Sequence, residues 1–204
     1  GRVNDLEYPK ARAAEMAKKF GYDYWDGDRR ICYGGYKYIE GRWEKIAKKI
    51  ADHYSLPKKP KILDIGCGKG FLLYDFLKVL PDADIYGIDI SDYAIENSKP
   101  EIKQNLIKGN AIDLPWEENF FDLVISINTL HCLHSYDLEL ALSEMERVGN
   151  SHKYLCVESY RNEVEKANLL YWQVSCEAFN TPEEWLWWFD KTKFTGDYSF
   201  IYFE

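Results

Sequence analysis

A short glycine-rich segment carries the clearest chemistry in the sequence. Gly66, Gly68 and Gly70 follow an apolar run in the spacing G-x-G-x-G, and Phe71 comes next. Glycine permits positive φ angles and lets a ligand approach the backbone closely. The spacing differs from the dinucleotide fingerprint, which needs glycine where Phe71 stands. It also differs from a Walker loop, in which Lys69 would be followed by Ser or Thr.

Two carboxylates accompany these glycines. Asp64 stands just before the first glycine, and Asp89 ends a second apolar run. A carboxylate at the tip of a second strand can accept hydrogen bonds from ribose hydroxyls. The combination indicates a loop that binds a ligand with a ribose, and the alternative reading is a plain tight turn between a strand and a helix.

Two histidines follow the apolar run 121–128. His131 is our candidate general base, because imidazole titrates near neutrality, and His134 and Asp137 are its candidate partners. Either histidine could instead be structural. A metal site made of these three side chains is an alternative that nothing else in the sequence supports, so we expect no metal.

The elements that must position these residues alternate between strands and helices. Apolar runs predict strands over residues 61–67, 84–90, 105–109, 121–128, 153–159 and 198–203. Helices are predicted over residues 71–80, 92–98, 138–148 and 163–174, and a last one is opened by Thr181 and Pro182 in a capping box with Glu184. This alternation predicts an α/β fold whose mainly parallel sheet is covered on both faces. Ligands bind such sheets beyond the carboxyl ends of the strands.

Residues 1–56 are predicted to form an N-terminal helical cap. Apolar residues recur at helical spacing over 41–54, residues 11–20 form another candidate helix, and residues 22–38 between them read as a loop. Within that loop, Tyr33-Gly-Gly-Tyr36 with Tyr38 and Arg42 forms a candidate lid over a ligand. A structural loop packed on the sheet is the alternative.

The sequence resembles the class I S-adenosylmethionine-dependent methyltransferases over residues 55–160. The resemblance rests on D-x-G-C-G-x-G at 64–70, on the acid at 89, on the G-N-A-I-D-L-P segment at 109–115 and on F-D-L-V-I-S at 121–126. It implies a Rossmann-like, doubly wound sheet of six or seven strands in residues 57–204. It also implies S-adenosyl-L-methionine as cofactor and S-adenosyl-L-homocysteine as product. Asn110 departs from the pattern, which has an acid there.

The resemblance also implies roles for individual residues. The glycines would lie against the methionine part, Asp64 would hold its amino group, and Asp89 would hold the ribose. The other implied cofactor contacts are Cys67, Ile90, Asn110, Ala111 and Asn128. The end of the fifth predicted strand would face the same cleft, so Tyr160 joins the histidines as a catalytic candidate, and the candidate acceptor contacts are Tyr33, Tyr36, Arg42 and Arg161.

A narrower resemblance suggests the acceptor. The segments at 32–38 and 168–172 are similar to a bacterial subgroup of small methyltransferases that accompany surface-polysaccharide biosynthesis. It implies methylation of a small molecule, at an oxygen of a sugar, a sugar nucleotide or a capsular polysaccharide precursor. The alternatives are N-methylation of a small amine and a non-catalytic module that binds the cofactor.

Composition limits the partners. The 204 residues include 34 acidic and 26 basic side chains, so the net charge of −8 argues against a general nucleic-acid binder. No apolar run approaches a membrane span. We recognise no secretory leader, and Gly1 rather than Met suggests a start that is either processed or left by cloning. Five cysteines without C-x-x-C spacing favour reduced thiols in the cytoplasm. Trp185, Trp188 and Phe189 suggest a core face or a homodimer contact.

Overall fold

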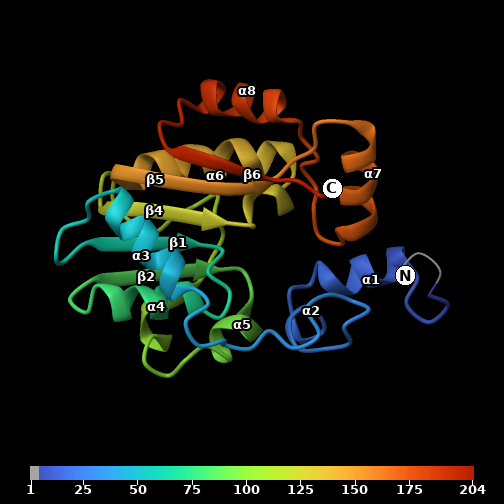
Figure 1. Cartoon of the computed structure of the whole chain (residues 1–204), viewed down its shortest axis with the longest axis horizontal. Coiled ribbons are helices and arrows are strands. Elements are labelled where there is room, and N and C mark those ends of the chain that lie inside the picture. The colour runs from blue at the N-terminus through green and yellow to red at the C-terminus, as the bar shows by residue number, and fades with distance from the viewer. Residues whose placement is uncertain (1–4) are drawn as a thin grey trace.

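The computed structural model describes residues 5–204 and is built around a six-stranded, fully parallel sheet (Figure 1). The first four residues of the predicted cap, including Gly1, lie outside the described residues. The strand order is β3-β2-β1-β4-β5-β6. The strands are β1 (Lys61–Ile65), β2 (Asp84–Asp89), β3 (Leu106–Lys108), β4 (Phe121–Ile127), β5 (Gly149–Glu158) and β6 (Asp197–Ile201). The predicted α/β fold with a parallel sheet is confirmed, with six strands.

The middle of the sheet is apolar on both faces because helices cover both. Ile62 of β1 pairs in register with Ile85 of β2 and Leu123 of β4, and all three side chains are buried. A doubly covered strand needs such a continuous apolar run. The helices are α1 (Lys10–Ala17), α2 (Tyr22–Trp25), α3 (Glu44–His53), α4 (Phe71–Val79), α5 (Asp92–Glu96), α6 (Ser135–Val148), α7 (Glu163–Trp172) and α8 (Pro182–Thr192).

Each face of the sheet has its own core. On one face α3 and α4 contribute Ile50 and Phe76 to a cluster with Ile62 and Leu123. On the other, α6 and α8 pack against alternate residues of the same strands, and the largest buried side chain there is Trp185. The sheet is therefore wound on both sides, as a Rossmann-like fold requires.

The predicted start of α8 is confirmed in detail. The Thr181 hydroxyl accepts the backbone N–H of Glu184, the Glu184 carboxylate accepts the backbone N–H of Thr181, and Pro182 occupies the first turn. Among the other expected elements, α1 ends at Ala17 rather than at residue 20, and Phe20 has a φ of 49° that no helix continues.

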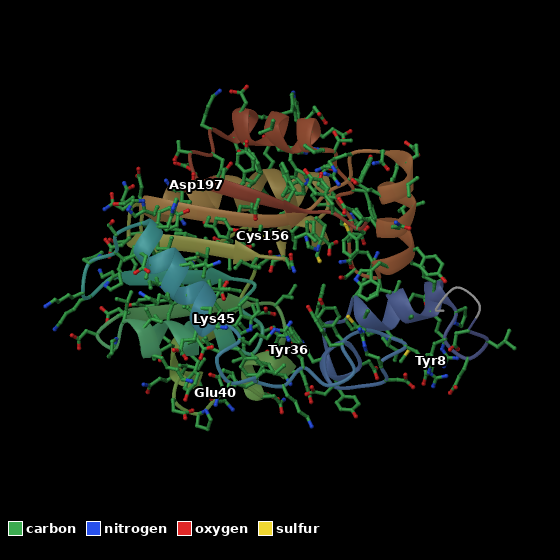
Figure 2. The ribbon with its side chains drawn as sticks, viewed as in Figure 1. Tyr8, Tyr36, Glu40, Lys45, Cys156 and Asp197 are labelled. Carbon is green, nitrogen blue, oxygen red and sulfur yellow. The ribbon has the colours of Figure 1, made fainter. Side chains whose placement is uncertain are left out.

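The N-terminal part forms a third, separate core. Residues 22–38 were expected to be a loop, but they contain the short helix α2. We call residues 20–38 the aromatic segment. Its buried Trp25 and Ile31 cluster with Ala13 and Ala17 of α1 and with Ala94 of α5. In Figure 2, Tyr36 of this segment lies toward the middle of the view, whereas Tyr8 lies near the N-terminal end.

Candidate functional site

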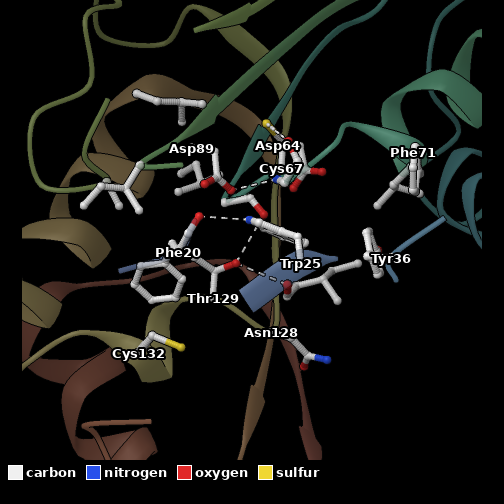
Figure 3. Close-up of a pocket in the computed structure, with 18 of the residues that line it drawn as sticks. Phe20, Trp25, Tyr36, Asp64, Cys67, Phe71, Asp89, Asn128, Thr129 and Cys132 are labelled. Carbon is white, nitrogen blue, oxygen red and sulfur yellow. Dashed lines mark hydrogen bonds between the residues drawn. The ribbon is translucent and has the colours of Figure 1, made fainter. Parts of the chain in front are cut away.

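A cavity of about 310 Å³ lies where the carboxyl ends of the central strands meet the aromatic segment (Figure 3). Its walls come from the end of β1 with residues 66–70, which we call the glycine loop, and from the end of β2, residues 109–111, the end of β4 and the aromatic segment. The volume is at the lower end of the range of small-molecule sites. The location is the one expected for a ligand of a parallel sheet.

The glycine loop is shaped by two positions at which only glycine fits. Gly66 has a φ of 77°, and a Cβ there would lie 2.1 Å from the Thr129 Oγ1 atom. Gly68 has a φ of 55°, and its Cβ would lie 2.7 Å from the Trp25 ring. Both glycines line the cavity. Gly70 also has a positive φ, but the side chains of Ile102 and Leu106 fill the space beside it, and it lies outside the cavity wall.

Asp89 holds the loop and keeps acceptor capacity toward the cavity. Its Oδ2 atom accepts the backbone N–H of Gly68 at 2.7 Å, and its Oδ1 atom accepts that of Ser91 at 2.8 Å. Burial raises the pKa of Asp89, and these two hydrogen bonds oppose the rise. A carboxylate has about four lone-pair sites, so further donors such as ribose hydroxyls can bind it.

Asp64 is a buried carboxyl group that has no cation or hydrogen-bond donor beside it among the described residues to offset its burial. Burial, and then the charge of Asp89, raise the pKa of Asp64 from 3.8 to about 8, and no hydrogen bond from residues 5–204 lowers it. The side chain lines the cavity. Because a buried charge is costly unless it is paired, this position favours a ligand with a positively charged group.

Three of the implied cofactor contacts, Ile90, Asn110 and Ala111, line the cavity. Ile90 is 54% exposed although it follows a buried strand, and Asn110 and Ala111 line the same wall. The Asn110 Oδ1 atom accepts the backbone N–H of Ile112 at 3.3 Å. Cys67 is buried and burial raises the pKa of its thiol well above the ordinary value, so it contributes contact area rather than a thiolate.

Asn128 reaches the cavity from the end of β4. Its φ of 57° is unusual for a residue other than glycine, and its backbone N–H is held by the carbonyl oxygen of Cys156 at 2.9 Å. The side chain is exposed and lines the cavity together with Thr129 and Cys132.

The aromatic segment forms the opposite wall. Trp25 and Tyr33 stack with their ring centroids 5.5 Å apart, and Tyr36 stacks on Phe71 at 5.3 Å. Tyr33, Tyr36 and Arg42, which were predicted acceptor contacts, all line the cavity. Arg42 is the sole cationic side chain among the described lining residues, and Tyr36 lies within electrostatic range of both Arg42 and Asp64.

Several lining residues were not predicted. These are Phe20, Tyr24, Trp25, Trp43, Ile65, Phe71, Leu72, Ile88, Gly109, Ile127, Thr129, Cys132 and Leu133. The density of aromatic residues around the Tyr-Gly-Gly-Tyr motif was the available signal for Trp25 and its neighbours. No local pattern connects Thr129 to Gly66.

The structure places both histidines away from the cavity wall. His131 is 1% exposed, and its Nε2 atom lies 3.5 Å from the Glu158 Oε2 atom. Burial lowers the pKa of His131 to about 4, so the ring is neutral near pH 7. His134 is largely exposed, stacks on Tyr136 and lies 3.8 Å from Glu177.

The candidates that follow β5, Tyr160 and Arg161, also lie away from the cavity. Tyr160 is buried, and the Lys166 ammonium lies 5.1 Å from the centre of its ring. Arg161 forms ion pairs with Glu165 at 2.5 Å and with Glu204 at 2.6 Å. Neither residue is part of the cavity wall. Over residues 5–204, His, Cys, Asp and Glu side chains form no cluster of three or more suited to a metal ion.

None of the helices within the described residues has the length and apolar content needed to cross a membrane.

Comparisons with known proteins point to methyltransferases. The family described as "Methyltransferase domain" matches residues 56–193. A demethylmenaquinone methyltransferase of Symbiobacterium thermophilum is 31% identical over 128 residues, which are 58% of this chain and 50% of that protein. An O-methyltransferase of Aspergillus nomiae is 29% identical over 149 residues, 70% of this chain and 63% of that protein. The chain thus spans about half to two thirds of the length of these relatives.

A solved structure gives the same fold. A putative S-adenosyl-L-methionine-dependent methyltransferase of Methanococcus maripaludis has a TM-score of 0.53 and 20% sequence identity, over 76% of this chain and 66% of that one.

Proposed function

The chain belongs to the methyltransferase domain family, and from this premise we propose that its cavity binds S-adenosyl-L-methionine and that the protein transfers the methyl group to a small-molecule acceptor. The observation that carries the proposal is the buried, unpaired Asp64 side chain beside a glycine loop that lines the cavity. A ligand with an ammonium group and a ribose fits Asp64 and Asp89 together.

Each part of the cavity wall has a place in this proposal. Asp64 would accept hydrogen bonds from the amino group of the methionine part, and Arg42 would bind its carboxylate, because guanidinium matches carboxylate geometry. Asp89 would accept hydrogen bonds from the ribose hydroxyls. Ile90 and Ala111 would pack on the adenine. The backbone of Gly66 and Gly68 would line the ligand's cavity, and the absence of a Cβ at each lets Thr129 and Trp25 pack against the loop.

When bound, the cofactor supplies a methyl group on a positively charged sulfur, which is a good leaving group. The protein therefore has to supply mainly position and a dry site. The aromatic segment would keep the site dry, since Trp25, Tyr33 and Tyr36 cover the glycine loop. Asn128, which follows β4, would contact the cofactor from the same cavity.

The proposal also concerns the acceptor of the methyl group. A sugar, sugar nucleotide or capsular precursor stays our prediction from the narrower resemblance. A hydroxyl acceptor needs a base, and the described wall contains no His, Glu or Lys side chain. N-methylation of a small amine and a non-catalytic cofactor-binding module are the alternatives. A homodimer, a cytoplasmic location and the absence of nucleic-acid substrates likewise stay predictions.

Isothermal titration calorimetry with S-adenosylmethionine, S-adenosylhomocysteine and NAD tests the proposal. We expect both sulfur-containing ligands to bind in the micromolar range and NAD not to bind. Asp89→Asn should weaken both, while Asp82→Asn, an exposed residue of the turn before β2, should not. Binding of NAD alone would refute the assignment. Release of S-adenosylhomocysteine in a cell extract would then separate an enzyme from a binding module.

A further inference from the structure

Asp26 lies where three segments around the cavity meet. Its Oδ2 atom accepts hydrogen bonds from the Lys69 ammonium at 2.6 Å and from the Tyr93 hydroxyl at 2.8 Å. Its Oδ1 atom accepts the backbone N–H of Tyr36 at 2.9 Å. Lys69 belongs to the glycine loop and Tyr93 to α5, which follows Asp89. One carboxylate of the aromatic segment thus joins the two segments that carry the proposed cofactor contacts.

Lys69, the partner of Asp26 on the glycine loop, depends on this contact. The Lys69 side chain is only 6% exposed, and its ammonium donates to Asp26 and to the backbone carbonyl oxygen of Tyr36 at 2.9 Å. Both hydrogen-bond acceptors of Lys69 belong to the aromatic segment. An ammonium that loses its partners while buried is strongly destabilised. The glycine loop is therefore stable with Lys69 buried only while the aromatic segment is packed against it.

Trp25, which precedes Asp26, makes a second set of contacts with the glycine loop and with the residues that follow β2. The Trp25 Nε1 atom donates to the Ser91 hydroxyl at 2.9 Å, and its ring lies against Gly68, where a Cβ would come within 2.7 Å of it. Ser91 follows the proposed ribose contact Asp89, whose Oδ2 atom accepts the Gly68 N–H. Trp25 and Asp26 thus hold the glycine loop from one side, and Asp89 holds it from the other.

We infer that Asp26 is a positioning residue. Through Lys69 it couples the packing of the aromatic segment over the cavity to the conformation of the glycine loop. Cofactor binding and covering of the cavity therefore occur together. The inference rests on the proposed function, because it takes the glycine loop as the cofactor's binding site. Asp26 lies outside the cavity wall, so it acts through Lys69 and not by touching the cofactor.

The test uses Asp26→Asn in the full chain, with Asp28→Asn as matched control. Asp28 lies in the same segment but pairs with Arg30 at 2.6 Å, away from the glycine loop. Two quantities are measured: the dissociation rate of S-adenosylhomocysteine by tryptophan fluorescence, and amide hydrogen exchange of residues 20–38 with and without saturating S-adenosylhomocysteine. In the unmodified protein and in Asp28→Asn, the ligand should slow exchange of these amides.

In Asp26→Asn we expect the dissociation rate to rise roughly 10–100-fold, and the ligand should no longer slow exchange of residues 20–38 while it still slows exchange at the end of β2. Asp26→Glu, which keeps a carboxylate acceptor for Lys69, should retain part of both properties. A purely structural role would lower the melting temperature and leave the ligand-induced protection of residues 20–38 intact, and that result would overturn the inference.

Two further outcomes are decisive. If the ligand binds the unmodified protein without slowing exchange of residues 20–38, the coupling is refuted although the proposed function stands. If no binding is detected in the unmodified protein, the proposed function itself fails. Should Asp26→Asn not fold, Lys69→Gln provides the same comparison from the other side of the contact, and unaltered dissociation and protection in that variant would equally refute the coupling.

Discussion

Asp64→Asn is expected to stabilise the protein without ligand and to weaken its binding of S-adenosylmethionine. Burial and the charge of Asp89 raise the pKa of Asp64 from 3.8 to about 8. In the unfolded chain the carboxyl has its ordinary pKa. Between about pH 4 and pH 8 the folded protein therefore holds a proton that the unfolded chain has released.

The sign and size of the effect follow from this difference. Because the folded state binds more protons in this window, the free energy of unfolding falls as the pH rises from about 4 to about 8. At pH 7, about three pH units above the ordinary pKa, keeping Asp64 protonated costs roughly 4 kcal/mol at about 1.4 kcal/mol per unit. Asparagine holds no such proton, so the variant should lose this pH-dependent cost.

The affinity should change in the opposite direction. A hydrogen bond to a charged group contributes about 1.5–3 kcal/mol, so loss of the carboxylate should weaken S-adenosylmethionine binding roughly 10–100-fold. In the unmodified protein the affinity should fall as the pH drops from about 8 to about 6, because the cofactor's ammonium competes with the proton on Asp64.

Urea denaturation at about pH 5, 7 and 8.5 and calorimetric titration measure both effects, with Asp82→Asn as the exposed control. The stability gain of Asp64→Asn should grow with pH. An equal gain at all three pH values would show that the carboxyl is not protonated in the folded protein. An unchanged affinity would show that Asp64 does not hold the amino group.

Three other substitutions test the structure around this site. Gly68→Ala should abolish detectable cofactor binding, since its Cβ meets the Trp25 ring and the φ is positive, and calorimetry that shows native affinity would contradict the loop geometry. Glu158→Gln should remove a pH dependence of stability: burial raises the pKa of Glu158 to about 7, so the folded protein holds a proton and loses stability as the pH rises from about 4.5 to about 7. Urea denaturation on both sides of that window would refute this if the variant and the unmodified protein changed in parallel. Thr181→Ala should lower the free energy of unfolding by about 1 kcal/mol through loss of the capping box, without altering cofactor affinity, and unchanged stability would argue against the cap.

Local patterns sufficed for the parts of the molecule that depend on sequence neighbours. Alternation of apolar runs predicted the parallel sheet, and the glycine spacing with Asp89 predicted a loop that lines a cavity. The capping box of α8 lies within four residues and was equally visible.

Positions that depend on distant contacts were not predictable in this way. His131 follows β4 as expected, but the short turn Leu130–Cys132 directs it to Glu158, which is 27 residues away in the sequence. The contact of Trp25 with Gly68 joins segments more than 40 residues apart. Arg161 was the exception, because its partner Glu165 stands at the i+4 position of the same sequence stretch and could have been recognised as a competing ion pair.

The strand order has a consequence for how the chain folds. β1 lies between β2 and β4, yet β4 begins 56 residues after β1 ends. During synthesis, one edge of β1 has no partner until residue 127 has left the ribosome, and an open apolar edge favours association with other chains. Translation that pauses between β3 and β4 should therefore be the stage at which this protein is most prone to aggregate.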